Sequence, residues 1–413
     1  IQLGMAYRRA DAYEDATACL TDALAESRAM NDERHAADTL YHLGTVAWST
    51  GRNEHAIRFH QEAVEICGRT ACTDLVAVQA YHGRGEAHFA NAEPAAAIRC
   101  YSRSLELARG IGDKSYESEN LMMIGHACTG AKGLGDYPRA RVNFEAALEI
   151  ARAADLQWHM GPTLLGLDHV LACTGHYGQA WAGMVKTLTW LQSLKHVRYQ
   201  LIACDFMGHL LLDLGLNEQA AEVLERGLAL GRNAGIMFWL AGIEASLAIA
   251  RARLGQRDVA QALEAAREQS QRTADRYMTP RCLEGLAELA LAQGDARRCR
   301  AFADELLALA EPGGLRELEA SARRWRGQAL FAEKSHAAAQ AELSQAAALA
   351  EGVGRTRLQW DAEAALARVC AAQGQREAAQ SHQAKAHAIA ATIAASLGTS
   401  GLEAQLRPTG GDG

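Results

Sequence analysis

The feature that most constrains the fold is an internal period of about 40 residues that runs through the whole chain. Each period contains two stretches whose apolar residues lie three to four positions apart, which predicts two amphipathic helices. In the copy from Leu43 to Ile66, Leu43 and Val46 lie in the first stripe, and Ala56 and Ala63 lie in the second. A hairpin this small cannot bury both stripes alone, so the sequence predicts a stack of hairpins.

The hairpins align on a small residue near the start of the second helix, which we call the anchor. The anchors are Ala16, Ala56, Ala97, Ala140, Ala180, Ala220, Ala260, Cys299, Ala339 and Ala379. Five residues earlier stand Gly51, Gly135, Gly175, Gly215, Gly255, Gly294 and Gly374, with Asp11, Ala92 and Lys334 in the other copies. Glycine there predicts that the first helix ends at this point, because it adopts a left-handed conformation at little cost.

A second column of small residues lies twelve positions before the anchor. It contains Gly4, Gly44, Gly85, Gly208 and Gly327, with Gly125 once an insertion is allowed, and Ala248, Ala287 and Ala367. We expect close helix contact at this column. The insertion is the stretch from Cys128 to Pro138, which predicts a lengthened turn, and no proline is expected in the middle of a helix.

The pattern predicts an array over residues 1–397 and a flexible tail over residues 398–413. Residue 1 matches the middle of the unit, so the first hairpin is truncated, and we expect either a longer protein or a missing upstream cap. At the other end, the last second helix is expected to continue through Ile389, Ile393 and Leu397 as a cap.

Composition excludes several classes of protein. The net charge of -7 arises from 42 basic and 49 acidic residues without a basic block, so nucleic acid is not an expected direct partner. No apolar run is long enough for a membrane span and no leader is recognisable, which favours a cytoplasmic protein. The ten cysteines include no CxxC pair, so we expect reduced thiols in helix packing rather than a metal site.

These hairpins have an LGxxA/Y run, the turn glycine, the anchor alanine and a second alanine seven residues later, and in these features they resemble the tetratricopeptide repeat. The resemblance implies an all-α, right-handed solenoid of about ten hairpins. The longer period is similar to arrays at the C-terminal end of bacterial signalling ATPases, cyclase-fused ATPases and maltose-regulator-type transcriptional activators. The tail from Ile389 to Arg407 resembles the ends of the cyclase-fused proteins.

In the family that the chain resembles, the first helices line a concave groove where partners dock. Eleven residues before the anchor, three successive copies have histidine, and positions four residues earlier and three residues later share that helix face. The predicted partner-binding residues are Tyr41, Trp48, His82, Glu86, Phe89, His126, His169, Asp205 and His209. The simpler interpretation of each histidine is solvation or a local hydrogen bond.

A metal at these histidines is disfavoured because packed helices lie about 8 to 10 Å apart, whereas zinc holds each nitrogen at about 2.0 to 2.1 Å. No phosphate-binding loop, dinucleotide fingerprint or nucleophile elbow is present. We therefore predict no cofactor and no catalysis by this chain, while an upstream catalytic domain stays open.

The sequence thus predicts a protein- or peptide-binding scaffold and regulatory module within a larger signalling protein. The alternative is a sensor whose concave surface binds a small-molecule effector on behalf of an ATPase-type regulator or nucleotide cyclase. A third hypothesis is an enzyme that uses the histidines.

Overall fold

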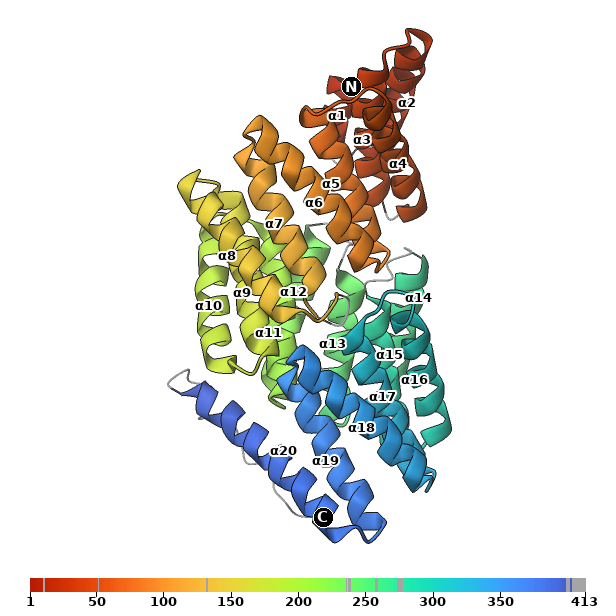
Figure 1. Cartoon of the computed structure of the whole chain (residues 1–413), viewed down its shortest axis with the longest axis vertical. Coiled ribbons are helices and arrows are strands. Elements are labelled where there is room, and N and C mark those ends of the chain that lie inside the picture. The colour runs from red at the N-terminus through yellow and green to blue at the C-terminus, as the bar shows by residue number, and fades with distance from the viewer. Residues whose placement is uncertain are drawn as a thin grey trace. The chain divides into compact units, whose positions relative to one another are not determined.

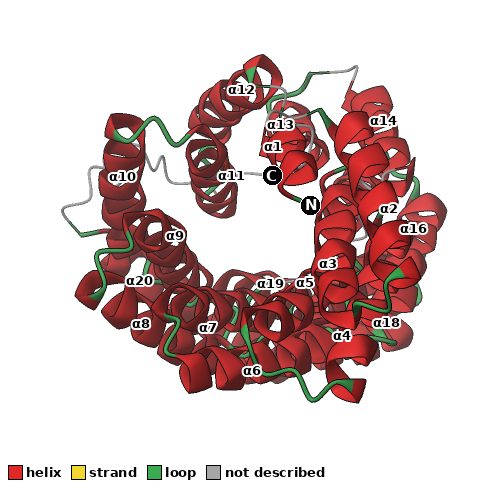
Figure 2. Cartoon of the chain, turned by 90° about the horizontal axis from the view of Figure 1, so that it is seen from above, coloured by secondary structure: helices red, strands yellow, loops and turns green. Residues whose placement is uncertain are grey.

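The computed structural model describes residues 1–9, 12–50, 52–130, 133–234, 236, 239–256, 259–272, 278–398 and 402. Every regular element within these residues is a helix (Figure 2). The first ten helices are α1 Gln2–Arg9, α2 Tyr13–Ala29, α3 Glu33–Ser49, α4 Asn53–Arg69, α5 Leu75–Ala90, α6 Pro94–Ile111, α7 Lys114–Cys128, α8 Tyr137–Ala153, α9 Gln157–Cys173 and α10 Tyr177–Ser193. The others are α11 Val197–Asp213, α12 Asn217–Asn233, α13 Leu240–Arg253, α14 Val259–Arg272, α15 Thr279–Ala292, α16 Ala296–Ala310, α17 Arg316–Ala332, α18 His336–Val353, α19 Thr356–Ala372 and α20 Arg376–Leu397.

Figure 1 labels most of these helices along the chain. The chain divides into two compact units. Unit 1 comprises Ile1–Ala127, Val142–Met160 and Ser270–Tyr277. Unit 2 comprises Cys128–Arg141, Gly161–Gln269 and Met278–Gly413. Within each unit, helices that follow one another in the chain pack against each other, as α3 does with α4 and α17 with α18, which confirms the predicted all-helical repeat architecture. A single array over residues 1–397 stays a prediction.

The predicted turns between the helices of each hairpin are confirmed. In all described copies the residue five positions before the anchor has φ between 58° and 88°, including the non-glycine residues Ala92 and Lys334. Gly51 and Asp11 lie outside the described residues. The turn between one hairpin and the next also has positive φ, as at Asn31, Ala71 and Asp155. Both kinds of turn therefore end a helix in the left-handed region.

The anchors are buried as expected. All of them except Ala260 and Ala379 are fully inaccessible to solvent. The small column has a specific partner: the residue four positions after the anchor covers it. A Cβ on Gly44 would lie 2.5 Å from the His60 ring, and a Cβ on Gly208 would lie 2.5 Å from Leu224. The small residue thus accommodates a large side chain of the second helix.

The fifth copy departs from this pattern, although Met184, four positions after its anchor, is still large and fully buried. Asp168 occupies the small column, and Gly183 lies opposite it on α10, where a Cβ would overlap the carboxylate. Asp168 is only 8% exposed, and its Oδ2 has no hydrogen-bond partner. Burial raises the pKa of Asp168 to about 7. Because Gly183 on α10 has no side chain, it leaves room for the carboxylate of Asp168 on α9.

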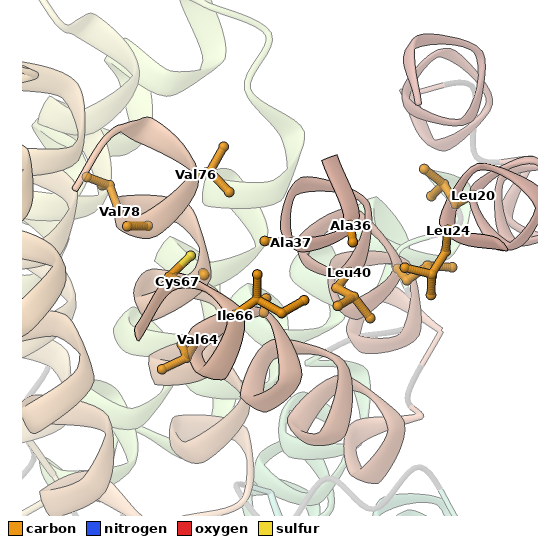
Figure 3. Packing of buried hydrophobic residues seen from close by; sticks show 14 of the residues in the cluster. Leu20, Leu24, Ala36, Ala37, Leu40, Val64, Ile66, Cys67, Val76 and Val78 are labelled. Carbon is orange, nitrogen blue, oxygen red and sulfur yellow. The ribbon is translucent and has the colours of Figure 1, made fainter. Parts of the chain in front are cut away.

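Apolar side chains join successive helices into a core. In unit 1, Leu24 of α2, Leu40 of α3, Ile66 of α4 and Val76 of α5 belong to one buried cluster (Figure 3). Burial of each such side chain stabilises the fold by about 1.5 to 3 kcal/mol relative to exposure. Each hairpin thereby contributes to a core that it shares with its neighbours.

Three details complete the comparison with the sequence. Pro162 lies inside α9, so the expectation that prolines avoid helix interiors is wrong there; α9 begins at Gln157, ahead of the proline. The lengthened turn separates α7 from α8, although residues 131 and 132 lie outside the described residues. The last helix continues through Ile389 and Ile393 to Leu397 as expected, and its role as a cap stays a prediction. The proposed tail, apart from Gly398 and Leu402, lies outside the described residues.

Candidate ligand-binding surfaces

The predicted binding residues fall in both units. Tyr41, Trp48, His82, Glu86, Phe89 and His126 belong to unit 1, whereas His169, Asp205 and His209 belong to unit 2. His82 and Asp205 are buried and the other seven are half-buried.

In unit 1, polar side chains of α3, α5 and α7 converge around His82. We call Tyr41, His82, Glu86, Tyr116, Glu119 and Asn120 the His82 cluster. The His82 Nδ1 lies 3.0 Å from Asn120 Oδ1, and its Nε2 lies 3.9 Å from Glu86 and 3.7 Å from Glu119. The hydroxyls of Tyr41 and Tyr116 lie 3.4 Å apart, which joins α3 to α7. First helices of three successive hairpins thus contribute to one polar site.

The electrostatics of this site favour a positive imidazole. Burial acts to lower the pKa of His82, but the nearby Glu119 and Glu86 carboxylates, with the Asn120 hydrogen bond, outweigh burial and raise it. Glu86 and Glu119 keep 28% and 34% of their side chains exposed. This face can therefore offer carboxylate oxygens to a ligand while His82 stays buried.

The remaining predicted residues of unit 1 lie in apolar surroundings. The His126 ring meets the edge of Phe144 at 4.9 Å, and burial lowers the pKa of His126 to about 4. Trp48 packs against a small cluster that contains Ala47 and Ala87. Phe89 is half-buried.

In unit 2, hydrogen bonds connect the first helices of four successive hairpins. We call Asp205, His209, Ser246, Arg281, Glu284 and Ser321 the unit 2 ladder. His209 Nε2 lies 3.4 Å from Asp205 and 2.9 Å from Ser246 Oγ. Arg281 Nε donates to the same hydroxyl at 3.1 Å. The ladder thus passes from α11 through α13 to α15.

The ladder continues to α17 and is supported from the side. Arg281 lies 3.4 Å from Glu284, and the Ser321 hydroxyl donates to Glu284 at 2.5 Å. Trp239 Nε1 donates to Asp205 at 2.7 Å, which fixes that buried carboxylate. His169 is stacked on Phe206 at 4.5 Å and is not in the ladder. Satisfied donors and acceptors hold these side chains in defined positions.

Sequence reasoning missed several of these residues. Glu284 lies fifteen positions before its anchor, in the same column as Tyr41, His82 and Asp205. Glu119, Arg281 and Ser321 lie one further turn back, eighteen positions before the anchor once the insertion is allowed. The column that contains Tyr41 and His82 already indicated Glu284. The other three residues could have been predicted by following the same helix face one turn further towards the start of the helix.

A separate cavity of about 610 Å³ lies among α12, α13 and α14 of unit 2, and none of the nine predicted residues lines it. Its walls include Leu228, Leu247 and Ala262. Two ion pairs also belong to its lining, Arg232–Glu244 and Arg251–Glu225, each at 2.9 Å. The charged groups at this cavity therefore neutralise one another.

Other chemistry finds no support in the residues that the structure describes. They contain no group of three His, Cys, Asp or Glu side chains that could hold a metal ion. All ten cysteines are free thiols. None of the described helices combines the length and the apolar character that a bilayer crossing requires.

Comparison with known proteins supports the fold. Residues 1–68 match the family model of the tetratricopeptide repeat. No curated protein matches the chain. A solved structure of a Rap protein complexed with competence and sporulation factor has a TM-score of 0.59 at 14% identity, covering 96% of this chain and 98% of that one.

Two further solved structures resemble the chain. The apo form of RapI has a TM-score of 0.54 at 15% identity, over 65% of this chain and 96% of that one. The Rap conjugation gene regulator of plasmid pLS20, in complex with the Phr* peptide, has a TM-score of 0.52 at 13% identity, over 75% and 76%. At these identities the likeness concerns the fold alone. The chain is thus an all-helical solenoid like those of the tetratricopeptide repeat, with a family match in residues 1–68.

Proposed function

We propose that this chain is a non-catalytic scaffold that binds a peptide or an extended protein segment across its first helices. The observation that carries the proposal is the unit 2 ladder, in which polar side chains are held in position across four successive hairpins. An extended peptide presents its own donors and acceptors at regular intervals and could bind along such a row. The Rap regulator of pLS20, which has a similar fold, was solved with a peptide.

Of the predicted residues, we assign His209 and Asp205 to this surface in unit 2, with His169 beside them. In unit 1 we assign Glu86 and Tyr41, the two predicted residues of the His82 cluster that surround His82. These assignments are supported by partial exposure of Glu86 and His209, whose side chains are 28% and 26% exposed. A ligand can reach such groups without a change in the hairpin core.

The test uses the purified full chain and an array of immobilised random-sequence decapeptides. Replacement of His169 and His209 together by alanine should reduce binding to the strongest spots by about tenfold, because two contacts of about 0.7 kcal/mol each are lost. The exposed histidine of α20, changed in His387→Ala, provides the matched control. Equal binding by the double variant and the control would remove the ladder as the binding surface.

The small-molecule sensor is less well supported. The cavity among α12, α13 and α14 has the volume of a ligand pocket, but its charged residues already pair with one another. It therefore offers few free groups to orient a small polar effector. A thermal shift with a metabolite, abolished by substitution of Leu247, would favour this alternative.

We infer a reducing compartment, the cytoplasm, because all ten cysteines are free thiols. A role within a larger signalling protein, of the ATPase or cyclase kind, is supported only by the sequence resemblance. Direct binding to nucleic acid is not proposed, since the net charge of -7 would oppose it.

A further inference from the structure

Segments of unit 2 that are far apart in the sequence meet directly. α20 packs against α10, and one end of α20 lies near α10 in Figure 1. The start of α19 meets the end of α11, which lies more than 140 residues earlier. A stack of hairpins does not require such contacts, because each hairpin packs on its neighbours in the chain.

Arg355 is at the centre of this contact. Its Nη2 lies 2.9 Å from Asp213 Oδ2 at the end of α11, and its Nε lies 3.0 Å from Glu317 Oε1 at the start of α17. Glu317 also accepts a hydrogen bond from the Tyr137 hydroxyl at the start of α8. Arg357 donates to the backbone carbonyl of Asp213. The Tyr177 hydroxyl, at the start of α10, donates to Asp213 Oδ2 at 3.3 Å. We call these six residues the Arg355 cluster.

The cluster is largely shielded from water. The side chains of Arg355, Asp213 and Glu317 are 16%, 22% and 9% exposed, and Tyr137 is 1% exposed. Burial raises the pKa of Glu317, with Arg355 acting against it. For Asp213, Arg355 and Arg357 outweigh burial and lower the pKa. Removal of one member would therefore leave a poorly solvated charge.

Glycines bring the same two sides into close contact. A Cβ on Gly135 would lie 3.0 Å from Val353, and a Cβ on Gly175 would lie 2.9 Å from Thr356. On α10, a Cβ on Gly178 would overlap the carbonyl oxygen of Ser396. Backbone rather than a flexible side chain forms that obstacle, so a larger residue at position 178 would push α20 away.

This contact differs in chemistry from the contacts between neighbouring hairpins. The latter bury alanine and leucine in shared cores, as around Leu343 and Leu366. The contact at Arg355 is made of ion pairs, tyrosine hydroxyls and backbone, and the Nη1 of Arg355 has no hydrogen-bond partner. Polar contacts of this kind are typical of surfaces that separate, because water can replace their hydrogen bonds.

We propose that the Arg355 cluster is a latch that closes unit 2 between α11 and α19, and that unit 2 opens there without unfolding its hairpins. The unit 2 ladder runs along α11, α13, α15 and α17, which lie between the latched ends in the chain. Opening would therefore change the spacing of the ladder. That consequence, unlike the latch itself, rests on the proposed function.

Cys173 reports on the latch without any ligand. It is 3% exposed, and burial raises the pKa of its thiol to about 12, with the positive charge of Arg355 acting against burial. Cys299 is fully buried within a hairpin core and serves as an internal reference. Alkylation of both thiols by iodoacetamide, resolved by peptide mass spectrometry, measures opening of the latch and unfolding of the hairpins separately.

Arg355→Gln should speed alkylation of Cys173 by about tenfold or more, with Cys299 and the helical circular dichroism unchanged. The matched control is Arg323→Gln. Arg323 is also partly buried, but it pairs within one hairpin, with Glu319 at 2.8 Å and Glu342 at 3.1 Å. In this control, Cys173 should be alkylated as slowly as in the unchanged protein.

Two milder variants decide the outcome if Arg355→Gln fails to fold. Asp213→Asn keeps the shape of the side chain, and the added methyl group of Gly178→Ala overlaps the Ser396 carbonyl oxygen. Both variants should speed alkylation of Cys173 but not of Cys299. Gly352→Ala, where a Cβ meets nothing within 4 Å, is the control for the glycine change. Unchanged Cys173 rates in both variants, or equal acceleration of Cys173 and Cys299, would overturn the latch. Neither outcome depends on peptide binding.

Discussion

The two units use the same repeat but place polar groups in different parts of the core. In unit 1 the residue that covers the small column is polar in two successive hairpins, at His60 and Tyr101. In unit 2 this residue is Leu224 in one copy, and the polar residue of the fifth copy, Asp168, occupies the small column itself. The repeat therefore fixes where side chains meet and at what combined size, but not their polarity.

The buried groups should respond to pH in opposite directions. His60 is 2% exposed, its Nδ1 has no hydrogen-bond partner, and burial, with His82 and His42, lowers its pKa to about 3. Asp168 has its pKa raised to about 7. Burial therefore favours the neutral form of both groups, one as a base and the other as an acid.

The strongest test introduces the polar residue of unit 1 into unit 2. Leu224→His should lower the free energy of unfolding by about 3 kcal/mol, since an apolar side chain is lost and an imidazole is buried without designed partners. Urea unfolding, followed by hydrogen exchange of peptides from α11 and α12, measures the loss. Leu224→Met is the control of similar volume. A loss below that of the control would mean that the column tolerates histidine in either unit.

The next effect concerns Asp168. Its folded pKa of about 7 lies above the ordinary value of 3.8, so the native state retains the proton longer as pH rises. Stability is then full below about pH 4, falls between pH 4 and 7, and is constant above. At pH 8, Asp168→Asn should stabilise unit 2 by about 2 kcal/mol, with little effect at pH 4. An equal effect at both pH values would contradict a buried, protonated carboxyl.

The reciprocal change in unit 1 should be smaller. His60→Leu removes an unpaired buried nitrogen and should stabilise unit 1 by about 1 kcal/mol at pH 7. Because the folded pKa of about 3 lies below the ordinary 6.5, the original protein loses stability as pH falls through this interval. The gain in His60→Leu should therefore grow between pH 6.5 and 5. Hydrogen exchange of α3 to α5 peptides at both pH values measures it, and a constant gain would contradict the lowered pKa.

The smallest effect is expected at the surface of unit 1. Arg103 and Glu106 form an exposed ion pair at 2.8 Å, with side chains 50% and 65% accessible. Arg103→Gln should change the free energy of unfolding by less than about 0.5 kcal/mol, and less still at high salt. Urea titrations at low and high salt provide the measurement. A larger loss would show that charge position matters outside the buried clusters as well.

Part of the candidate surface could be read from the sequence. The columns placed His82 and Glu86 together on one helix face, and Asp205 with His209 on another, because positions four apart share a face. The partners Ser246 and Arg281 come from other hairpins, and Trp239 approaches Asp205 from the turn before α13. Such neighbours depend on how hairpins pack, which a one-dimensional alignment does not specify.

The sequence by itself determined the helices, their turns, the anchors and the small column, because these depend on local backbone preference and on a period that repeats. Only the tertiary structure decided that His60 lies buried between Gly44 and Gly83, and that Arg355 meets Asp213. The physical reason is that a period describes contacts between neighbouring hairpins. The contact at Arg355 forms between segments more than 140 residues apart. Whether such segments meet depends on the accumulated rotation between successive hairpins, which no local sequence pattern specifies.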